Sequence, residues 1–305
     1  MAQAFNLDGK TAIVTGAGNG LGRAEALSLA DCGANVVLND LAGPAIREVA
    51  DQIGERAIAV EGDISEWSTG EALLSAALDF GRLDIVVNNA GVLRDRMIFT
   101  MSPDEWDTVL GVHLRGHFIT SRLATAYWRD QSKKAGGPVY GRIINTSSEA
   151  FLLGSPGQPN YAAAKAGIVA LTLTTARSCA RYGVRANAIC PRARTDMTAE
   201  LMGAAPGGTD PLAPEHVAPL VSYLASPAAE PINGEVFVVH GGIAAVLEAP
   251  KLRTVFHAAE HGSQDGMWTP DSVASALAGH FDGTGSGFAS EATLVLADET
   301  IGFSQ

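Results

Sequence analysis

Short runs of aliphatic and β-branched residues alternate with longer stretches rich in alanine and leucine along most of the chain. The runs at residues 11–15, 35–39, 57–61, 83–87, 142–146, 185–189 and 235–239 are predicted strands, and stretches such as residues 21–31 are predicted helices. Near-continuous apolar strands separated by helices are typical of a parallel sheet covered on both faces. The pattern therefore predicts an α/β fold in which a seven-stranded parallel sheet is doubly wound.

The last fifth of the chain is different. Residues 243–305 break the alternation, with a turn-like stretch at residues 279–288 and a possible strand at residues 292–296. About sixty residues are too few for a second independent core. We therefore expect a main domain of residues 1–242 and a C-terminal extension of residues 243–305 that packs on this domain or on a neighbouring subunit.

The charge and the cysteines narrow the choice of function. The chain has 21 Lys and Arg against 33 Asp and Glu, a formal net charge of -12, which disfavours nucleic acid and anionic membranes as partners. Cys32, Cys179 and Cys190 are far apart and form neither a disulfide framework nor a zinc motif, so no metal is expected. The N-terminus has no signal-peptide pattern, and no apolar run reaches the length of a membrane span. These features predict a cytoplasmic protein.

A glycine-rich turn follows the first predicted strand. In the sequence TGAGNGLG at residues 15–22, Gly16, Gly20 and Gly22 let the backbone turn tightly and approach a pyrophosphate at the start of the next helix. Asp40 ends the second predicted strand, where a carboxylate can accept hydrogen bonds from the adenosine ribose and repels a 2′-phosphate. Asn19, inside the turn, is not basic. The motif therefore predicts a dinucleotide site that prefers NAD to NADP.

A tyrosine and a lysine lie four residues apart at the start of another predicted helix. This spacing places Tyr161 and Lys165 on one helix face, where an ammonium group lowers the pKa of a neighbouring phenol. Ser148 ends the fifth predicted strand, thirteen residues before Tyr161, and can donate a hydrogen bond to a substrate oxygen. The three residues predict a general acid/base site for an alcohol or a ketone.

Taken in order, these motifs resemble those of the short-chain dehydrogenase/reductase family. Over about residues 6–242, residues 15–22 fit its TGxxxGxG turn, residues 63–64 its adenine contact and residues 88–91 its NNAG element. The resemblance implies a Rossmann fold and an NAD-dependent oxidoreductase. The predicted cofactor contacts are Gly16, Asn19, Gly20, Leu21, Gly22, Asp40, Asp63, Ile64, Asn89, Ala90, Gly91, Tyr161, Lys165 and Thr195, and the predicted catalytic residues are Ser148, Tyr161, Lys165 and His113.

Two positions depart from the family pattern. His113 stands where the family usually has the asparagine of a proton relay, so either its backbone carbonyl or its imidazole serves the relay, or it is a buried structural histidine. The loop at residues 190–195, CPRART, is shorter than usual before Thr195, which matches the residue that contacts the nicotinamide carboxamide. Arg192 and Arg194 in this loop are candidates for pairing with a phosphate of coenzyme A or are surface arginines without a ligand.

Residues 36–41, 113–116 and 191–195 resemble a narrower subgroup, the dehydrogenase unit of the peroxisomal multifunctional enzyme of β-oxidation and its stand-alone actinobacterial relatives. Members of this group oxidise 3-hydroxyacyl-CoA thioesters, and several act on 17β-hydroxysteroids. The apolar residues 151–153, 197 and 201–202 follow the sites where the family builds its substrate pocket. The resemblance therefore implies oxidation of a hydrophobic secondary alcohol, most simply a 3-hydroxyacyl-CoA.

Two other functions stay open at this stage. The first is an NADPH-dependent 3-oxoacyl-carrier-protein reductase, which has the same catalytic set. The second is a non-catalytic dinucleotide-binding sensor, although a sensor has no use for a tuned phenol.

The resemblance also implies a homodimer or homotetramer that pairs through residues 104–129 and 161–182. The second of these stretches carries apolar residues on more than one face, among them Ile168, Val169, Leu171 and Leu173. Because the extension begins just after the last predicted strand, we expect it to lie near the mouth of the substrate site.

Overall fold

The computed structural model describes residues 5–198, 203, 207, 210–248, 252, 254–262, 266–278 and 280. Its strands are β1 (Thr11–Thr15), β2 (Asn35–Asp40), β3 (Ala57–Glu61), β4 (Ile85–Asn88), β5 (Gly141–Thr146), β6 (Val184–Pro191), β7 (Val236–His240) and β8 (Ile243–Val246). Its main helices are α1 (Gly20–Asp31), α2 (Gly43–Ile53), α3 (Trp67–Asp79), α4 (Pro103–Leu110), η2 (Gly111–Arg115), α5 (Gly116–Ala135), α6 (Ala150–Leu153), α7 (Pro159–Cys179), α9 (Ala218–Ala225), η6 (Ala258–His261) and α10 (Pro270–Leu277). The predicted segments at residues 281–288 and 292–296 lie outside the described residues.

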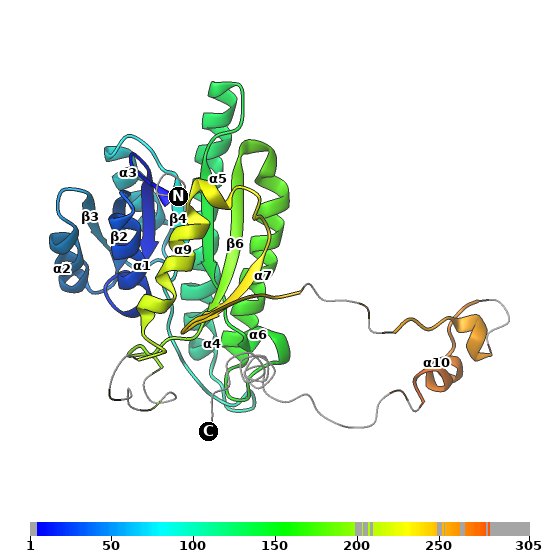
Figure 1. The fold of residues 1–305 in the computed structure, drawn as a ribbon. Helices are drawn as coiled ribbons and strands as arrows, with labels where there is room; N and C mark the ends of the chain where they lie inside the picture. The colour runs from blue at the N-terminus through cyan, green and yellow to red at the C-terminus, as the bar shows by residue number, and fades with distance from the viewer. Residues whose placement is uncertain are drawn as a thin grey trace.

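The strands form one sheet in the order β3-β2-β1-β4-β5-β6-β7-β8 (Figure 1). Strands β1 to β7 are parallel, and each begins within two residues of its predicted start. The chain reverses its direction of travel across the sheet between β1 and β4, which is the switch point where such folds bind ligands. The predicted doubly wound α/β fold is confirmed.

Strand β8 adds an eighth strand that the sequence pattern did not predict. It pairs antiparallel with β7, with His240 opposite Ile243 and Phe237 opposite Val246. Gly241 at the turn has φ +49°, a conformation that favours glycine. The first residues after position 242 therefore continue the sheet instead of leaving it.

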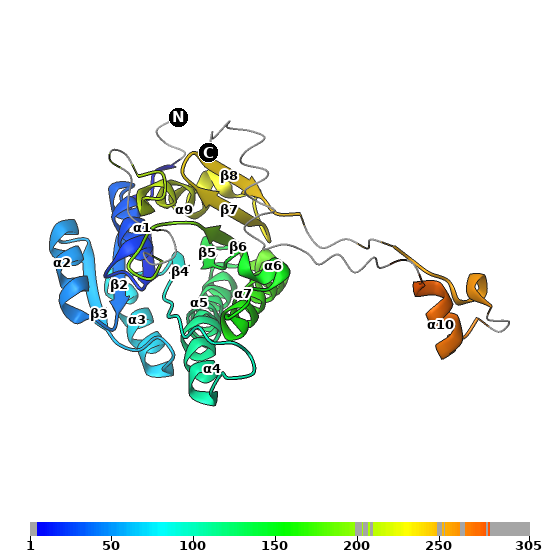
Figure 2. The ribbon, with the colours of Figure 1, turned by 90° about the horizontal axis from the view of Figure 1, so that it is seen from below.

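Helices cover both faces of the sheet (Figure 2). On one face, α1, α2 and α9 pack against alternate strand residues such as Val14 and Leu38. On the other face, α3, α5 and α7 pack against the intervening residues, such as Ile13 and Val37. Successive side chains of a strand point to opposite faces, so two apolar layers explain why the strands are apolar without interruption.

The described part of the extension beyond β8 lies apart from the sheet in both views (Figures 1 and 2). Its short helix η6 packs against α10, and Phe256, His261, Trp268 and His280 make ring contacts with one another. Several apolar side chains remain exposed, and these are Leu252, Val255, Met267, Trp268, Val273 and Leu277. The part of the extension that the structure describes does not bury these residues.

Candidate active site

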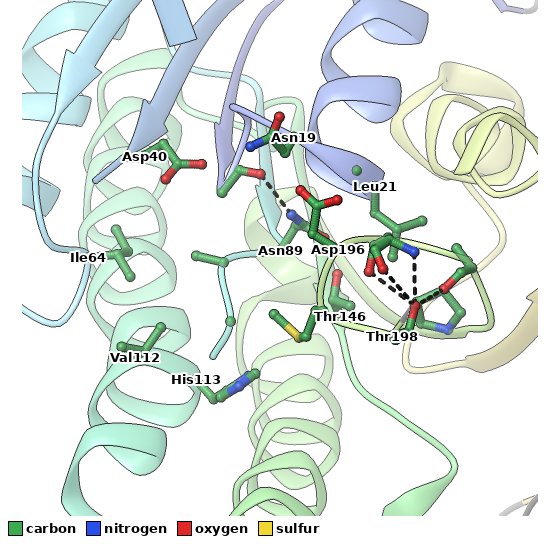
Figure 3. A pocket seen from close by; sticks show the side chains of 18 of the residues that line it. Asn19, Leu21, Asp40, Ile64, Asn89, Val112, His113, Thr146, Asp196 and Thr198 are labelled. Carbon is green, nitrogen blue, oxygen red and sulfur yellow. Dashed lines mark hydrogen bonds between the residues drawn. The ribbon is translucent and has the colours of Figure 1, made fainter. Parts of the chain in front are cut away.

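A cavity of about 330 Å³ opens at the carboxyl ends of β1 and β4 (Figure 3). Side chains from both halves of the sheet converge on it, with Asp40 and Ile64 on one side and Thr198 on the other. Of the predicted site residues, the cavity is lined by Gly16, Asn19, Gly20, Leu21, Asp40, Ile64, Asn89, Ala90, Gly91, His113, Tyr161, Lys165 and Thr195. The fold thus gathers residues that are up to 179 positions apart, from Gly16 to Thr195, around one cavity at the switch point.

The glycine turn forms a cradle at one wall of the cavity. Gly16 and Gly20 have φ of +66° and +53°, a left-handed conformation that other residues rarely adopt. A Cβ on Gly16 would lie 2.8 Å from Cα of Ala90, and a Cβ on Gly22 would lie 2.2 Å from the carbonyl oxygen of Gly16. Helix α1 begins here without a side-chain cap, so the amides of its first turn are available to an anion. This wall fits the pyrophosphate of a dinucleotide.

Asp40 is held in place at the end of β2. Its Oδ2 accepts a hydrogen bond from the amide of Gly18 at 3.0 Å, and its Oδ1 accepts one from the amide of Ala42 at 3.3 Å. The carboxylate thereby connects the glycine turn to the start of α2. An oriented acceptor at this place fits a ribose with free hydroxyl groups.

The loop after β4 is anchored to the glycine turn by polar contacts. The Asn89 side-chain amide donates to the carbonyls of Thr15 and Gly16 at 3.1 and 3.2 Å. The Thr15 hydroxyl in turn accepts from the amides of Asn89 and Ala90. These bonds hold the carboxyl ends of β1 and β4 together on both sides of the switch point.

Lys165 and Tyr161 lie on the buried side of α7, as their spacing predicts. Lys165 is 2% exposed, and its Nζ donates to the carbonyl of Thr146 at 2.6 Å and lies 5.2 Å from the centre of the Tyr161 ring. Ser148 lies at the same end of β5, and its side chain lowers the pKa of Tyr161 in part, against the larger effect of burial. The geometry can hold a substrate oxygen between a serine and a tyrosine.

In the folded chain, the pKa of Tyr161 is not lowered as the sequence predicted. Burial raises the pKa of Tyr161 to about 12, and burial lowers the pKa of Lys165 to about 7. The expectation that Lys165 lowers the pKa of Tyr161 considered only their spacing on the helix. In the folded chain, loss of water around both groups is the larger effect.

His113 is buried in the π-helical turn η2, between α4 and α5. Its Nε2 lies 3.0 Å from the amide nitrogen of Val92 and 2.9 Å from its carbonyl, and its ring meets the Tyr161 ring edge-on at 5.2 Å. Burial, followed by the charge of Lys165, holds the pKa of His113 well below its usual value. A neutral imidazole that bonds to the loop after β4 and touches Tyr161 fits both a structural and a relay role.

Three predicted residues do not line the cavity. Gly22 is needed for close packing of the turn, Asp63 accepts a hydrogen bond from the amide of Ser65 at 2.8 Å, and Ser148 reaches the site through Tyr161. In the loop after β6, Arg192 is paired with Glu149 and Arg194 with Asp210, so both guanidinium groups already have carboxylate partners.

Met197, which the sequence placed at the substrate pocket, lines the cavity. Sequence reasoning missed other lining residues, namely Asn39, Leu41, Gly62, Val112, Thr146, Ser147, Pro191, Ala193, Asp196 and Thr198. Most lie within two residues of the carboxyl end of a strand. That position is the signal by which they could have been found, because the carboxyl ends of parallel strands share one edge. The hydroxyl of Thr198 donates to the carbonyl of Ala193 at 2.6 Å and accepts from the amide of Thr195, which shapes the loop after β6 (Figure 3).

Among the residues that the structure describes, no helix has the length and apolar character needed to cross a membrane.

Comparison with known families and proteins gives consistent matches. A family model described as short chain dehydrogenase matches residues 10–204. The chain is 54% identical over 292 residues to a protein of Mycobacterium tuberculosis (strain ATCC 25618 / H37Rv) named hydroxyacyl-CoA dehydrogenase ChsB1, across 91% of this chain and 90% of that one. It is 40% identical over 252 residues to the peroxisomal multifunctional enzyme type 2 of Mus musculus, across 79% of this chain and 33% of that longer protein.

Two solved structures are similar as well. A short chain dehydrogenase from Mycobacterium avium has a TM-score of 0.79 and 44% identity, across 89% of this chain and 96% of that one. A 3-ketoacyl-(acyl-carrier-protein) reductase from Brucella melitensis, in complex with NADH, has a TM-score of 0.70 and 32% identity, across 78% of this chain and 99% of that one.

Proposed function

Because this chain belongs to the short-chain dehydrogenase/reductase family and is an oxidoreductase that acts on CH–OH groups, we propose that it interconverts a 3-hydroxyacyl-CoA and its 3-oxo form with NAD. The observation that supports the proposed substrate is the 54% identity, over nine-tenths of both chains, to a protein named as a hydroxyacyl-CoA dehydrogenase. Its membership of an enzyme family sets the sensor alternative aside.

The proposed chemistry assigns a task to each residue of the catalytic set. The hydroxyl groups of Ser148 and Tyr161 hold the substrate oxygen, and Tyr161 takes the alcohol proton during oxidation and returns it during reduction. Lys165 provides positive charge next to the phenol and is placed to hold a ribose hydroxyl. The nicotinamide, when bound, accepts the hydride and brings positive charge into the site. This added charge favours the phenolate that burial alone disfavours.

The preference for NAD is proposed from the wall of the cavity at Asp40. Its carboxylate is fixed by two backbone amides and lines the cavity, and the proposed adenosine ribose lies against it. Glu61 lies opposite Asp40 on the neighbouring strand β3 and is paired with Arg47. A 2′-phosphate would meet the carboxylate of Asp40 there, and the charges would repel each other.

The apolar character of the substrate is supported by side chains around the catalytic set. Met197 lines the cavity and is 42% exposed, and Leu152 and Leu153 of α6 are exposed just after Ser148. An exposed apolar side chain in the cavity, with two more on the short helix after Ser148, suits an acyl chain better than a sugar.

The second candidate is a 3-oxoacyl-carrier-protein reductase, because such an enzyme is structurally similar to this chain. That enzyme is described in complex with NADH, so preference for NAD does not by itself separate the two functions. The group that carries the acyl chain does separate them.

The test is a screen by NADH absorbance of 3-hydroxyacyl-CoA and 3-oxoacyl-CoA thioesters of increasing length. The same acyl groups on acyl carrier protein and a set of 17β-hydroxysteroids are measured alongside. We expect the highest kcat/KM on a coenzyme A thioester. A clear preference for the carrier protein or for a steroid would replace the proposed substrate.

A further inference from the structure

A largely buried ion pair begins at the residue that follows Ser148 in the sequence. Glu149 follows Ser148, and its carboxylate accepts two hydrogen bonds from Arg192: Oε2 from Nε at 2.6 Å and Oε1 from Nη2 at 3.0 Å. The Glu149 side chain is 9% exposed and the Arg192 side chain is 13% exposed. Two parallel bonds between planar groups fix both the distance and the angle of the pair.

The two partners follow neighbouring strands, at the carboxyl ends that border the cavity. Glu149 follows β5, and Arg192 follows β6 between Pro191 and Ala193, which both line the cavity. The backbone amide of Arg192 donates to the carbonyl of Val239 at 3.0 Å, so the end of β7 is tied to the same point. The pair therefore joins the Ser148 turn to the loop that leads to Thr195.

Stability alone is a weak reason for such a pair. Removing two charges from water has a large cost, and a buried pair recovers it only with good geometry. An apolar contact would hold the same two loops at lower cost. The bidentate geometry does what an apolar contact does not, because it fixes the two loops in one relative position.

We propose that Glu149 and Arg192 are a positioning pair for hydride transfer. Through this pair, the hydroxyl of Ser148, which orients the substrate oxygen, keeps a fixed distance from the loop of Thr195, which faces the nicotinamide end of the cavity. The inference rests on the proposed function of Ser148. It also gives Arg192 a role inside the protein in place of a contact with a phosphate of coenzyme A.

The chain contains a matched control on the same two strands. Arg142 at the start of β5 donates to Glu230 at 2.6 Å, and Arg185 near the start of β6 pairs with the other oxygen of this carboxylate. This cluster also ties β5 to β6 through arginine and glutamate. This cluster lies at the amino ends of the two strands, whereas the cavity lies at their carboxyl ends.

The experiment compares Glu149→Gln with Glu230→Gln. Each change removes the charge of a carboxylate that is paired with arginine and keeps the size of the side chain. Glu149 pairs with Arg192, and Glu230 pairs with Arg142 and Arg185. Reduction of acetoacetyl-CoA by NADH is measured together with the deuterium isotope effect from NADH labelled at the transferred hydrogen, the Kd of NADH and Tm. For Glu149→Gln we expect kcat to fall about 10- to 100-fold, because small misplacements of reacting groups have effects of this size. The isotope effect should rise, and the Kd of NADH should stay within about two-fold.

Glu230→Gln should leave kcat and the isotope effect unchanged whatever its effect on Tm. Arg192→Lys keeps the charge and loses the two-pronged geometry, so its kcat should also fall, and it carries the test if Glu149→Gln does not fold. Normal kcat in a folded Glu149→Gln or Arg192→Lys protein, or an equal loss in Glu230→Gln, would overturn the proposal. If the wild-type enzyme does not reduce acetoacetyl-CoA, the comparison is made on the 3-oxoacyl-CoA length that it reduces best. If it reduces no coenzyme A thioester, the proposed substrate fails, and the comparison is made on the ketone that it does reduce.

Discussion

Tyr161 is the residue on which the proposed chemistry depends most directly. Its ring contacts His113 and Lys165, and the side chain of Ser148 acts on the pKa of its hydroxyl. Tyr161→Phe keeps the ring and removes only the proton that is exchanged. We expect kcat to fall about 100-fold or more while the Kd of NADH stays nearly unchanged. Steady-state kinetics and NADH fluorescence measure both values, and near-normal turnover in this variant would reject the assignment of Tyr161.

Asp40 determines the proposed choice between the two dinucleotides. In Asp40→Ser, the ribose loses an acceptor and the 2′-phosphate loses a repelling charge. We expect KM for NAD to rise about ten-fold and the preference for NAD over NADP to shrink by a larger factor. Steady-state kinetics with both cofactors provide the measurement. An unchanged preference would mean that Asp40 does not face the ribose.

Glu25 is a buried acid that the proposed reaction does not use. It lies on α1, is 0% exposed, and neither of its carboxylate oxygens has a hydrogen-bond partner in the structure. Burial raises its pKa from 4.5 to about 8. Between these two pH values the folded chain keeps a proton that the unfolded chain releases, so stability falls as pH rises from about 4.5 to about 8.

Replacing Glu25 by Gln removes this dependence, because an amide does not titrate. The free energy of unfolding of the wild type should fall relative to Glu25→Gln by at most about 1.4 kcal/mol per pH unit in this range. Urea unfolding at pH 5, 7 and 9 gives the comparison. Parallel curves for the two proteins would show that Glu25 has an ionic partner or stays hydrated.

At the scale of elements, the π-helical turn η2 depends on the loop beside it. A Cβ on Gly91 would lie 2.5 Å from Cε1 of His113, so the imidazole occupies the space that a side chain at position 91 would need. Because His113 bonds to Val92 and touches Tyr161, the turn and the loop set each other's position. A wide turn at a functional site is a frequent use of π-helical geometry.

Gly91→Ala tests this packing. We expect a loss of about 1–3 kcal/mol in the free energy of unfolding and a lower kcat, since the backbone or the imidazole must move. Gly111→Ala is the control within η2, because its Cβ would lie 3.7 Å from the nearest atom, the Cβ of Ser65. Thermal unfolding and kcat are measured for both. If the two variants behave alike, the contact between Gly91 and His113 is not what restricts this position.

At the scale of the whole molecule, apolar surface remains to be covered. On α7, Ile168 is buried within the chain and Val169, Leu171 and Leu173 are half-buried, so this helix accounts for less exposed surface than the sequence suggested. Phe118 of α5 is 46% exposed, and the extension exposes six further apolar side chains. We therefore keep the homo-oligomer as a proposal, with the extension of residues 243–305 covering a neighbouring subunit close to its substrate site.

Truncation after residue 248 tests the role of the extension. This end point keeps β8, whose pairing with β7 a cut at residue 243 would destroy. We expect a higher KM for long-chain substrates and a smaller sedimentation coefficient or lower Tm. NAD affinity should be unchanged, because Gly16 and Asp40 lie in the sheet domain. A truncated enzyme with unchanged assembly and unchanged kinetics on its best substrate would leave the extension without a role at the site.

The amino-acid sequence alone determined the parallel sheet and more than half of the residues that line the cavity. Uninterrupted apolar strands require two covered faces, and Val14 and Val37 accordingly pack into opposite layers. Gly16 and Gly20 have the left-handed backbone that their motif implies, and the spacing of Tyr161 and Lys165 brings both to the cavity. These features are local, since they depend on the period of a strand, the freedom of glycine and the pitch of a helix.

The tertiary structure decided what depends on distant groups. The pKa of Tyr161 rises because segments far apart in the sequence exclude water from it, which the spacing to Lys165 does not reveal. Arg192 pairs with Glu149 because β5 and β6 are neighbours in the sheet, and β8 forms because β7 offers an open edge. Burial and pairing across strands arise only when the chain has folded. For this reason, the sequence predicted which residues line the cavity better than it predicted their pKa values and ion pairs.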